Sequence, residues 1–252
     1  MDDKLQITAS IVLFNERLEE LTRAINSFME TPLSKKLFLI DNSPRKIFIE
    51  EFKHPDIEYI FMGKNVGFGT GHNLVLNKIK NISTHHLILN ADVYFNASVI
   101  EKLIAVLNEN EDVAVVAPKV KYPNGTLQIT YRKYPTFLQL AKRFFAISGK
   151  KEEYPSKNVK PFSPDFLHGC FLLFKTKDFV KLNGFDERYF MYMEDVDIAR
   201  KMDQLGMKKL YYPDVEITHV FKKGSSKNIR LFFIHVRSII KYYQKWGWKV
   251  RG

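Results

Sequence analysis

Apolar, β-branched runs alternate with helical patterns along the first half of the chain, and this alternation constrains the fold most. The run from Gln6 to Phe14 reads as a strand, and Leu18, Leu21, Ile25 and Phe28 then recur at helical spacing. Further strands are predicted over Lys36–Ile40, Glu58–Met62, His86–Leu89 and Val113–Ala117, and further helices over Gly69–Lys80 and Ser98–Asn108. Strands that alternate with helices indicate an α/β fold, with a mostly parallel sheet covered on both faces.

The pattern changes after residue 118. Pro123-Asn124-Gly125 is a hairpin turn signal, and the apolar run Phe171–Phe174 is expected to return to the sheet. A helix is expected over Ile198–Leu205, and a short strand over Met207–Tyr211. No long linker divides the chain, so we expect one domain over residues 1–224, with halves at 1–118 and 119–224, and a basic amphipathic helix over 225–252.

Residues 183–197 pass from a glycine turn through four aromatic residues to a cluster of acids. Acidic side chains are favoured at a helix start by the helix dipole, which accounts for one or two of Glu194, Asp195 and Asp197. It does not account for an aromatic wall set against all three. Carboxylates beside apolar rings lose hydration, which raises their pKa and suits them to general-base catalysis. This stretch therefore predicts a functional site.

The motifs of this stretch resemble a known family. The stretch contains, in order, Gly184-Phe185-Asp186-Glu187, Phe190-Met191-Tyr192, Glu194-Asp195-x-Asp197 and Arg200. This order is similar to the acceptor-side motif of inverting family-2 glycosyltransferases, most closely of the rhamnosyltransferase-like subgroup. Four more segments agree in order between Ser10 and about His219. The resemblance implies a single Rossmann-like nucleotide-diphospho-sugar transferase (GT-A) domain, with a donor nucleotide-binding first half and an acceptor or catalytic second half.

Polar residues at the strand ends are candidates for the donor site, because ligands of open parallel sheets bind at the carboxyl ends of the strands. Asn90-Ala91-Asp92 resembles the family's Asp-x-Asp motif, which implies that Asp92 binds Mg²⁺ or Mn²⁺ while Asn90 lies beside the donor. A plain strand-end turn would also favour Asn and Asp here.

Two other strand ends carry candidate donor contacts. Phe14-Asn15 follows the first strand, and Asp41 ends the second. The resemblance implies that Phe14 and Asp41 lie near the base or ribose of a nucleotide. The alternatives are core packing for Phe14, and for Asp41 an Asx-turn before Pro44.

The glycine-rich stretch Asn65–Asn73 leads into a helix, but it has neither the Gly-Lys-Ser/Thr of a P-loop nor the dinucleotide GxGxxG spacing. It resembles a segment of rhamnosyltransferase-like members, which implies that Asn65, Gly67 and Gly69, together with Gly71, let the backbone approach the donor. A glycine-rich turn before a tightly packed helix is the alternative.

Two later positions complete the implied site. In related transferases a histidine at the place of His219 completes the metal site, and neutral imidazole binds Mn²⁺. A lone histidine is more often structural or simply exposed. The resemblance implies that Gly169 lines the donor sugar, and Cys170 reads as a small buried residue rather than a nucleophile, because no basic triad stands beside it.

The implied reaction is a single displacement that inverts the anomeric carbon. An acceptor hydroxyl needs a base to remove its proton, and the resemblance makes Asp195 that base, with Glu194 as second choice. Asp197 and Arg200 are expected to hold the helix start through an ionic contact.

The charge of the chain suggests an acidic partner. The net charge is +11, and residues 222–252 carry nine Lys/Arg and no Asp/Glu. We expect the C-terminal helix to pack on the body over its first half, while its basic residues meet an anionic membrane. The absence of a signal-peptide pattern, a long apolar run and paired cysteines leads us to expect a cytoplasmic protein, peripheral on the inner face of the membrane.

Two rival functions stay open. The basic, aromatic tail could stack nucleic-acid bases, although no RRM, KH, zinc or helix-turn-helix pattern is present, which argues against it. A non-catalytic nucleotide-sugar binding protein is the other rival. The expected partners are therefore a nucleoside-diphosphate sugar donor and a glycan or lipid-linked saccharide acceptor.

Overall fold

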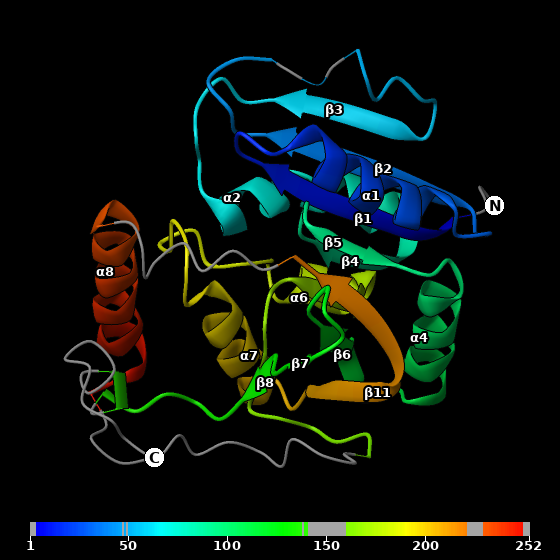
Figure 1. Cartoon of the computed structure of the whole chain (residues 1–252). Coiled ribbons are helices and arrows are strands. Elements are labelled where there is room, and N and C mark those ends of the chain that lie inside the picture. Colours follow the sequence, from blue (N-terminus) through cyan, green and yellow to red (C-terminus); the bar gives the residue numbers. More distant parts are fainter. Residues whose placement is uncertain are drawn as a thin grey trace.

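The structure is a computed structural model that describes residues 4–46, 48, 50–137, 139–140, 160–220 and 229–248. Within these residues, nine strands form one central sheet (Figure 1) in the order β3-β2-β1-β4-β10-β6-β11-β5, with β7 paired to β6. These strands are β1 (Leu5–Leu13), β2 (Lys35–Asp41), β3 (Ile57–Phe61), β4 (Ser83–Leu89), β5 (Val93–Phe95), β6 (Val113–Lys121), β7 (Leu127–Gln128), β10 (Phe171–Lys175) and β11 (Lys208–His219). A small second sheet pairs β8 (Tyr131–Arg132) with β9 (Phe166–Leu167).

The sheet is mostly parallel, as the sequence predicted. Strands β1 to β4 run in one direction, and β6 runs parallel to β11. Strand β10 lies antiparallel between β4 and β6, and β5 is antiparallel to β11. The turn signal at Pro123-Asn124-Gly125 joins β6 to β7, where Gly125 has a φ of 80°.

Helices cover both faces of the sheet because its strands are apolar on both sides. In β2, Leu37 and Leu39 join the cluster that includes α1 (Leu18–Met29) and α4 (Ser98–Glu109). Phe38 and Ile40 point the other way, into the cluster that holds residues of α3, α6, α7 and α8. Those helices span α3 (Leu76–Ile82), α6 (Thr176–Lys181), α7 (Glu194–Gln204) and α8 (Ile229–Trp246).

Three predicted elements differ from the observed ones. The helix expected over Gly69–Lys80 is two short helices, α2 (Phe68–Asn73) and α3, because the chain leaves the regular helix at Leu74–Val75. Helix α7 begins at Glu194, four residues before the predicted start, so the three acids lie in its first turn. Strand β11 is longer than predicted and ends at His219.

The C-terminal helix α8 stands beside α7 at one side of the molecule (Figure 1). Its buried residues, Ser238, Ile239, Tyr242 and Tyr243, lie in its second half. The expectation that its first half packs on the body is therefore wrong: Ile229 is 71% exposed and Phe233 63%. Among the described residues, none of the helices combines the length and apolarity that crossing a bilayer would take.

Candidate active site

Asp92 and His219 form a pair at the carboxyl-end edge of the sheet. The antiparallel pairing of β5 with β11 sets His219 opposite Val93, and the backbone N–H of Val220 donates to the carbonyl oxygen of Asp92 at 2.9 Å. The Nε2 atom of His219 consequently lies 3.2 Å from Oδ1 of Asp92. His219 is buried and Asp92 is partly exposed, so the pair opens toward solvent on the carboxylate side.

The segment His168–Cys170 borders this pair. Burial raises the pKa of the Cys170 thiol, but the neighbouring imidazoles of His219 and His168 outweigh burial and lower it. Burial lowers the pKa of His219, yet Cys170 and Asp92 together raise it. Cys170 is buried, as predicted, and the imidazoles of His168 and His219 lie beside its thiol. Asn90 contacts the same segment through its backbone, because its N–H donates to the carbonyl of Cys170 at 3.0 Å.

Asp195 lies on the other side of the same segment. The backbone N–H of Gly169 donates to Oδ2 of Asp195 at 3.3 Å. A methyl group placed on Gly169 would meet only ordinary contacts, with Phe68 and the Cβ of Asp195. The predicted base and the predicted sugar-lining glycine are therefore neighbours in space.

The three acids of α7 have different surroundings. Asp195 is partly exposed, whereas Glu194 and Asp197 are buried. Burial, aided by the charge of Asp195, raises the pKa of Glu194 to about 8, and its Oε2 atom has no hydrogen-bond partner among the described residues. Of the three, Asp195 is the carboxylate that is open to solvent.

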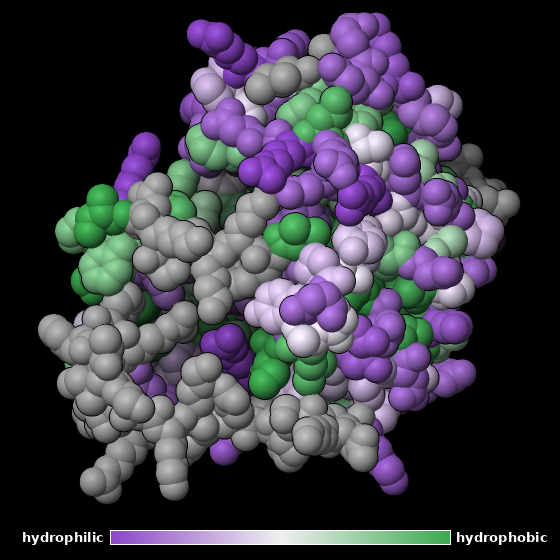
Figure 2. Space-filling model, in the orientation of Figure 1, coloured by the Kyte–Doolittle hydropathy of each residue, from purple (hydrophilic) through white to green (hydrophobic). Residues whose placement is uncertain are grey.

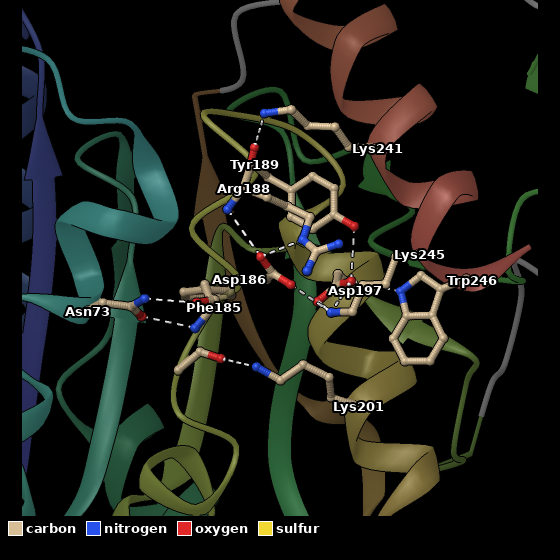
Figure 3. A network of polar contacts seen from close by, with 11 residues as sticks. Asn73, Phe185, Asp186, Arg188, Tyr189, Asp197, Lys201, Lys241, Lys245 and Trp246 are labelled. Carbon is tan, nitrogen blue, oxygen red and sulfur yellow. Dashed lines mark hydrogen bonds and ion pairs between the residues drawn. The ribbon is translucent and has the colours of Figure 1, made fainter.

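Asp197 anchors the C-terminal helix, which corrects the expected contact with Arg200. Its carboxylate accepts hydrogen bonds from Tyr189 (3.0 Å), Lys245 (2.8 Å) and Trp246 (2.7 Å), as Figure 3 shows. Arg200 instead donates to the hydroxyl of Tyr242. A local helical spacing predicted the wrong partner, because Lys245 and Trp246 come from α8 and Tyr189 from the loop before α7.

The ends of β1 and β2 bring the predicted nucleotide contacts together. Phe14 is 47% exposed, which is not core packing, and the backbone N–H of Asn15 donates to Ser43 Oγ at 2.9 Å. Asp41 makes the Asx-turn that the sequence left open, accepting from the N–H of Ser43 at 2.8 Å. The hydroxyl of Tyr59 donates to its second oxygen.

The glycines of the Asn65–Asn73 stretch pack against protein. A Cβ at Gly67, where φ is 95°, would lie 2.4 Å from the carbonyl oxygen of Phe190. At Gly69 it would meet Phe185, and at Gly71 it would meet Val12. Tight packing at the helix start, the alternative that the sequence left open, is therefore sufficient to account for these glycines. Donor contact at Gly67 and Gly69 stays a prediction.

Asn65 closes the turn before α2. Its side-chain oxygen accepts from the N–H of Gly67 at 3.0 Å, and Asn42 donates to the carbonyl of Gly67 at 3.1 Å. Asn42, Tyr59 and His168 had not been chosen from the sequence. Asn42 and His168 are sequence neighbours of the chosen residues Asp41 and Gly169, so the sequence could have suggested them. Tyr59 comes near Asp41 only because β3 pairs with β2, which no local pattern predicts.

The Asp92–His219 pair fits a divalent cation. Two ligands at right angles around an ion at about 2.1 Å lie about 3 Å apart, close to the 3.2 Å found here. A carboxylate and an imidazole suit Mn²⁺. The described residues hold no group of three or more His, Cys, Asp and Glu side chains arranged for a metal, so phosphates and water would supply the other ligands.

Comparisons with known proteins identify the family of the chain. Residues 8–182 match the family model described as glycosyl transferase family 2, and residues 153–224 match a model described as the N-terminal domain of galactosyltransferase. An N-acetylglucosaminyl-diphospho-decaprenol L-rhamnosyltransferase of Mycobacterium tuberculosis is 24% identical over 87% of this chain and 76% of its own. The rhamnosyltransferase WbbL of Escherichia coli K12 is 29% identical over 44% of this chain and 42% of its own.

Solved structures show the same fold. GalNAc-T7, solved with UDP, GalNAc and Mn²⁺, matches with a TM-score of 0.66 and 15% identity over 87% of this chain. The chain spans only 44% of that protein's length. The mannosyltransferase PcManGT from Pyrobaculum calidifontis, solved with GDP-Man and Mn²⁺, matches with a TM-score of 0.64 and 15% identity, over 96% of this chain and 65% of its own. At these identities the likeness shows the fold alone, which is the predicted GT-A fold.

Proposed function

The chain belongs to glycosyl transferase family 2, and from this premise we propose that it transfers a hexose from a nucleoside diphosphate to a hydroxyl group. A dTDP-rhamnose-like donor is favoured and a UDP-sugar comes next, because two of its relatives are named rhamnosyltransferases. The proposed acceptor is a glycan or lipid-linked saccharide in cell-surface polysaccharide synthesis.

One observation carries this proposal. The segment His168–Cys170 contacts the Asp92–His219 pair on one side and Asp195 on the other. A diphosphate held at the pair would place its sugar beside Gly169, next to an acceptor hydroxyl that is hydrogen-bonded to the Asp195 carboxylate. The candidate leaving-group site and the candidate base would then lie on opposite sides of the sugar.

The proposed reaction is one displacement with inversion. The acceptor oxygen forms a bond to the anomeric carbon while the bond from that carbon to the diphosphate oxygen breaks. Asp195 takes the proton of the acceptor hydroxyl. The hydrogen bond from Gly169 orients the Asp195 carboxylate, and burial raises the pKa of Glu194 to about 8, so Glu194 holds its own proton near neutral pH and is not free to take that of the acceptor.

We propose that Asp92 and His219 hold Mg²⁺ or Mn²⁺. When bound, the ion would neutralise the charge that develops on the departing diphosphate. Phe14, Asn15, Asp41, Asn65 and Asn90 are proposed to line the nucleotide, in a donor half over residues 1–118, with the acceptor half over 119–224.

We also propose that the protein works at the inner face of the cell membrane, as a cytoplasmic protein bound to the surface. One relative is named for a decaprenol-linked acceptor, which resides in a membrane. The exposed start of α8 has apolar residues beside Arg230 and Arg237, a combination typical of interfacial helices.

A donor panel tests the function. The protein is incubated with Mn²⁺ and dTDP-rhamnose, UDP-hexoses or GDP-mannose, with and without a polyprenyl-diphosphate N-acetylglucosamine acceptor, and release of nucleoside diphosphate is measured. We expect acceptor-stimulated release with one donor and an inverted anomeric configuration in the product. Nucleotide binding without release from any donor would instead favour the non-catalytic binding protein.

A further inference from the structure

The backbone before α7 is strained. Tyr192 and Met193 have φ angles of 68° and 70°, two consecutive residues with side chains in the left-handed region. Side chains are disfavoured there, and such residues persist only where their surroundings hold them. Met193 directly precedes α7, and its carbonyl accepts from the N–H of Asp197 at 2.8 Å. The strained pair therefore sets the direction in which α7 leaves and where Asp195 points.

Two elements hold this strained turn. On the donor side, the carbonyl of Phe190 accepts from the backbone N–H of Phe68 at 2.9 Å. On the other side, Ser238 of α8 donates from its hydroxyl to the carbonyl of Met191 at 2.8 Å. The ring of Tyr192 lies against that of His235, also on α8, with 4.6 Å between their centres.

Ser238 belongs to one face of α8 that contacts the segment 186–200. The residues on this face are spaced three or four apart and are, in order, His235, Ser238, Lys241 with Tyr242, and Lys245 with Trp246. Lys241 donates to the carbonyl of Arg188, and Lys245 pairs with Asp186 as well as Asp197 (Figure 3). The helix thus holds both the turn before Asp195 and the first turn of α7 after it.

We propose that Ser238 is a positioning residue for Asp195. Ser238 is 2% exposed, and its hydroxyl donates to the carbonyl of Met191, next to the strained turn. Losing this bond lets the Tyr192–Met193 turn relax and shifts Asp195 relative to Gly169. A misplacement of about 1 Å lowers turnover by as much as about 10²-fold, even when substrate binding is unchanged. This inference rests on the proposed transferase function.

Three variants test the role of Ser238. Ser238→Ala removes the hydroxyl, Ser238→Thr keeps it, and Gln244→Ala changes an exposed position of the same helix. We expect Ser238→Ala to lower kcat about 10-fold or more with donor Kd unchanged, whereas Ser238→Thr and Gln244→Ala keep wild-type kcat. Hydrogen exchange of a peptide covering residues 190–197 should accelerate in Ser238→Ala alone.

The outcomes separate this inference from the proposed function. Unchanged kcat and unchanged exchange in Ser238→Ala would overturn the positioning role. So would a lower Tm with unchanged kcat per folded molecule, since that is what a merely structural residue gives. If the wild-type protein transfers no sugar from any donor, the proposed function fails, and the exchange measurement still decides whether Ser238 holds the turn.

Discussion

Gly169 and Asp195, 26 positions apart in sequence, are joined by a hydrogen bond of 3.3 Å from the glycine N–H to the aspartate carboxylate. The residues on either side of Gly169 face His219, so the same short segment borders the candidate metal pair and the candidate base. Gly169 lies just before β10 begins, and Asp195 lies in the first turn of α7. The contact therefore joins the starts of two elements and not their middles.

The first prediction concerns the base. Asp195→Asn should keep the contact with Gly169, because the amide oxygen still accepts a hydrogen bond, but it cannot take a proton. We expect near-normal donor binding and a loss of turnover of about 10²-fold or more. Steady-state kinetics with the identified donor and acceptor check this. Near wild-type turnover in Asp195→Asn, together with abolished turnover in Glu194→Gln, would move the base to Glu194.

The second prediction concerns the pH dependence of stability. The pKa of Glu194 is raised from 4.5 to about 8, so between these values the folded protein holds a proton that the unfolded chain has released. The stabilisation by protonated Glu194 is complete below about pH 4.5 and is lost as the pH rises through 8. Glu194→Gln mimics the neutral carboxyl and should raise the free energy of unfolding at pH 8.5 by about 1 to 4 kcal/mol.

Urea denaturation at several pH values measures this difference, which should shrink toward pH 4.5. Glu101→Gln, at an exposed position of α4, is the control and should change little at any pH. A Glu194→Gln variant that is less stable than wild type at pH 8.5 would mean that the buried carboxyl is charged and held by contacts that Gln cannot replace.

The third prediction concerns the metal. Asp92 is the partly exposed member of the pair with His219, and a divalent cation needs its carboxylate oxygen. We expect nucleoside-diphosphate binding, measured by calorimetry, to require Mg²⁺ or Mn²⁺ and to be lost in Asp92→Ala. The control is Asp56→Ala, at an exposed position before β3. Equal affinity in excess EDTA, or in Asp92→Ala, would contradict the metal role.

The fourth prediction separates steric conflict from backbone strain. Gly67 and Gly125 have φ angles of 95° and 80°, so alanine is strained at both. Only at Gly67 does the new Cβ meet protein, 2.4 Å from the carbonyl of Phe190, whereas nothing lies within 4 Å at Gly125. We expect Gly125→Ala to lower the free energy of unfolding by about 1 kcal/mol and Gly67→Ala by at least twice as much. Equal losses would mean that the turn at Phe190 yields without cost.

The sequence predicted those parts of the fold that depend on local residue patterns. The strand and helix periods of residues 5–121 have their cause within a few residues of each position, and most elements there were predicted to within a few residues, apart from β5, which was missed, and the helix that is split into α2 and α3. The antiparallel place of β10 between β4 and β6 was not predicted. It depends on pairings such as Leu173 with Leu87 and Val116, which no short pattern encodes.

The candidate site was also predicted only in part. The resemblance named residues that the fold does bring together, including Asp92 with His219 and Gly169 with Asp195. The partner of Asp197 was predicted wrongly, because helical spacing suggested Arg200, while the donors are Tyr189, eight residues earlier, and two residues of α8 that lie 48 and 49 residues later. For the glycines the sequence left donor approach and tight packing both open, since a sequence cannot show that Phe190 or Val12 lies against Gly67 or Gly71.

The last prediction concerns the membrane, and the structure changes which residues should bind it. Lys241 and Lys245 are engaged with Arg188, Asp186 and Asp197, so they are not available to lipid, and Lys249 lies outside the described residues. Apolar atoms gather instead over the exposed side of α8 (Figure 2), where Ile229, Phe233 and Ile240 are exposed. Arg230 and Arg237 are exposed on the same helix.

Liposome co-sedimentation tests this surface. Each Arg near an anionic surface contributes about 1 kcal/mol, so Arg230→Gln with Arg237→Gln should weaken binding to anionic vesicles roughly 30-fold. Phe233→Ser should weaken binding to anionic and neutral vesicles alike, because it removes apolar contact rather than charge. Salt should weaken the wild-type interaction, since exposed charges are screened, whereas Lys102→Gln on α4 should have no effect. Wild-type protein that binds neither vesicle would mean that this face of α8 meets another protein or only water, and the site would then have to receive its acceptor from solution.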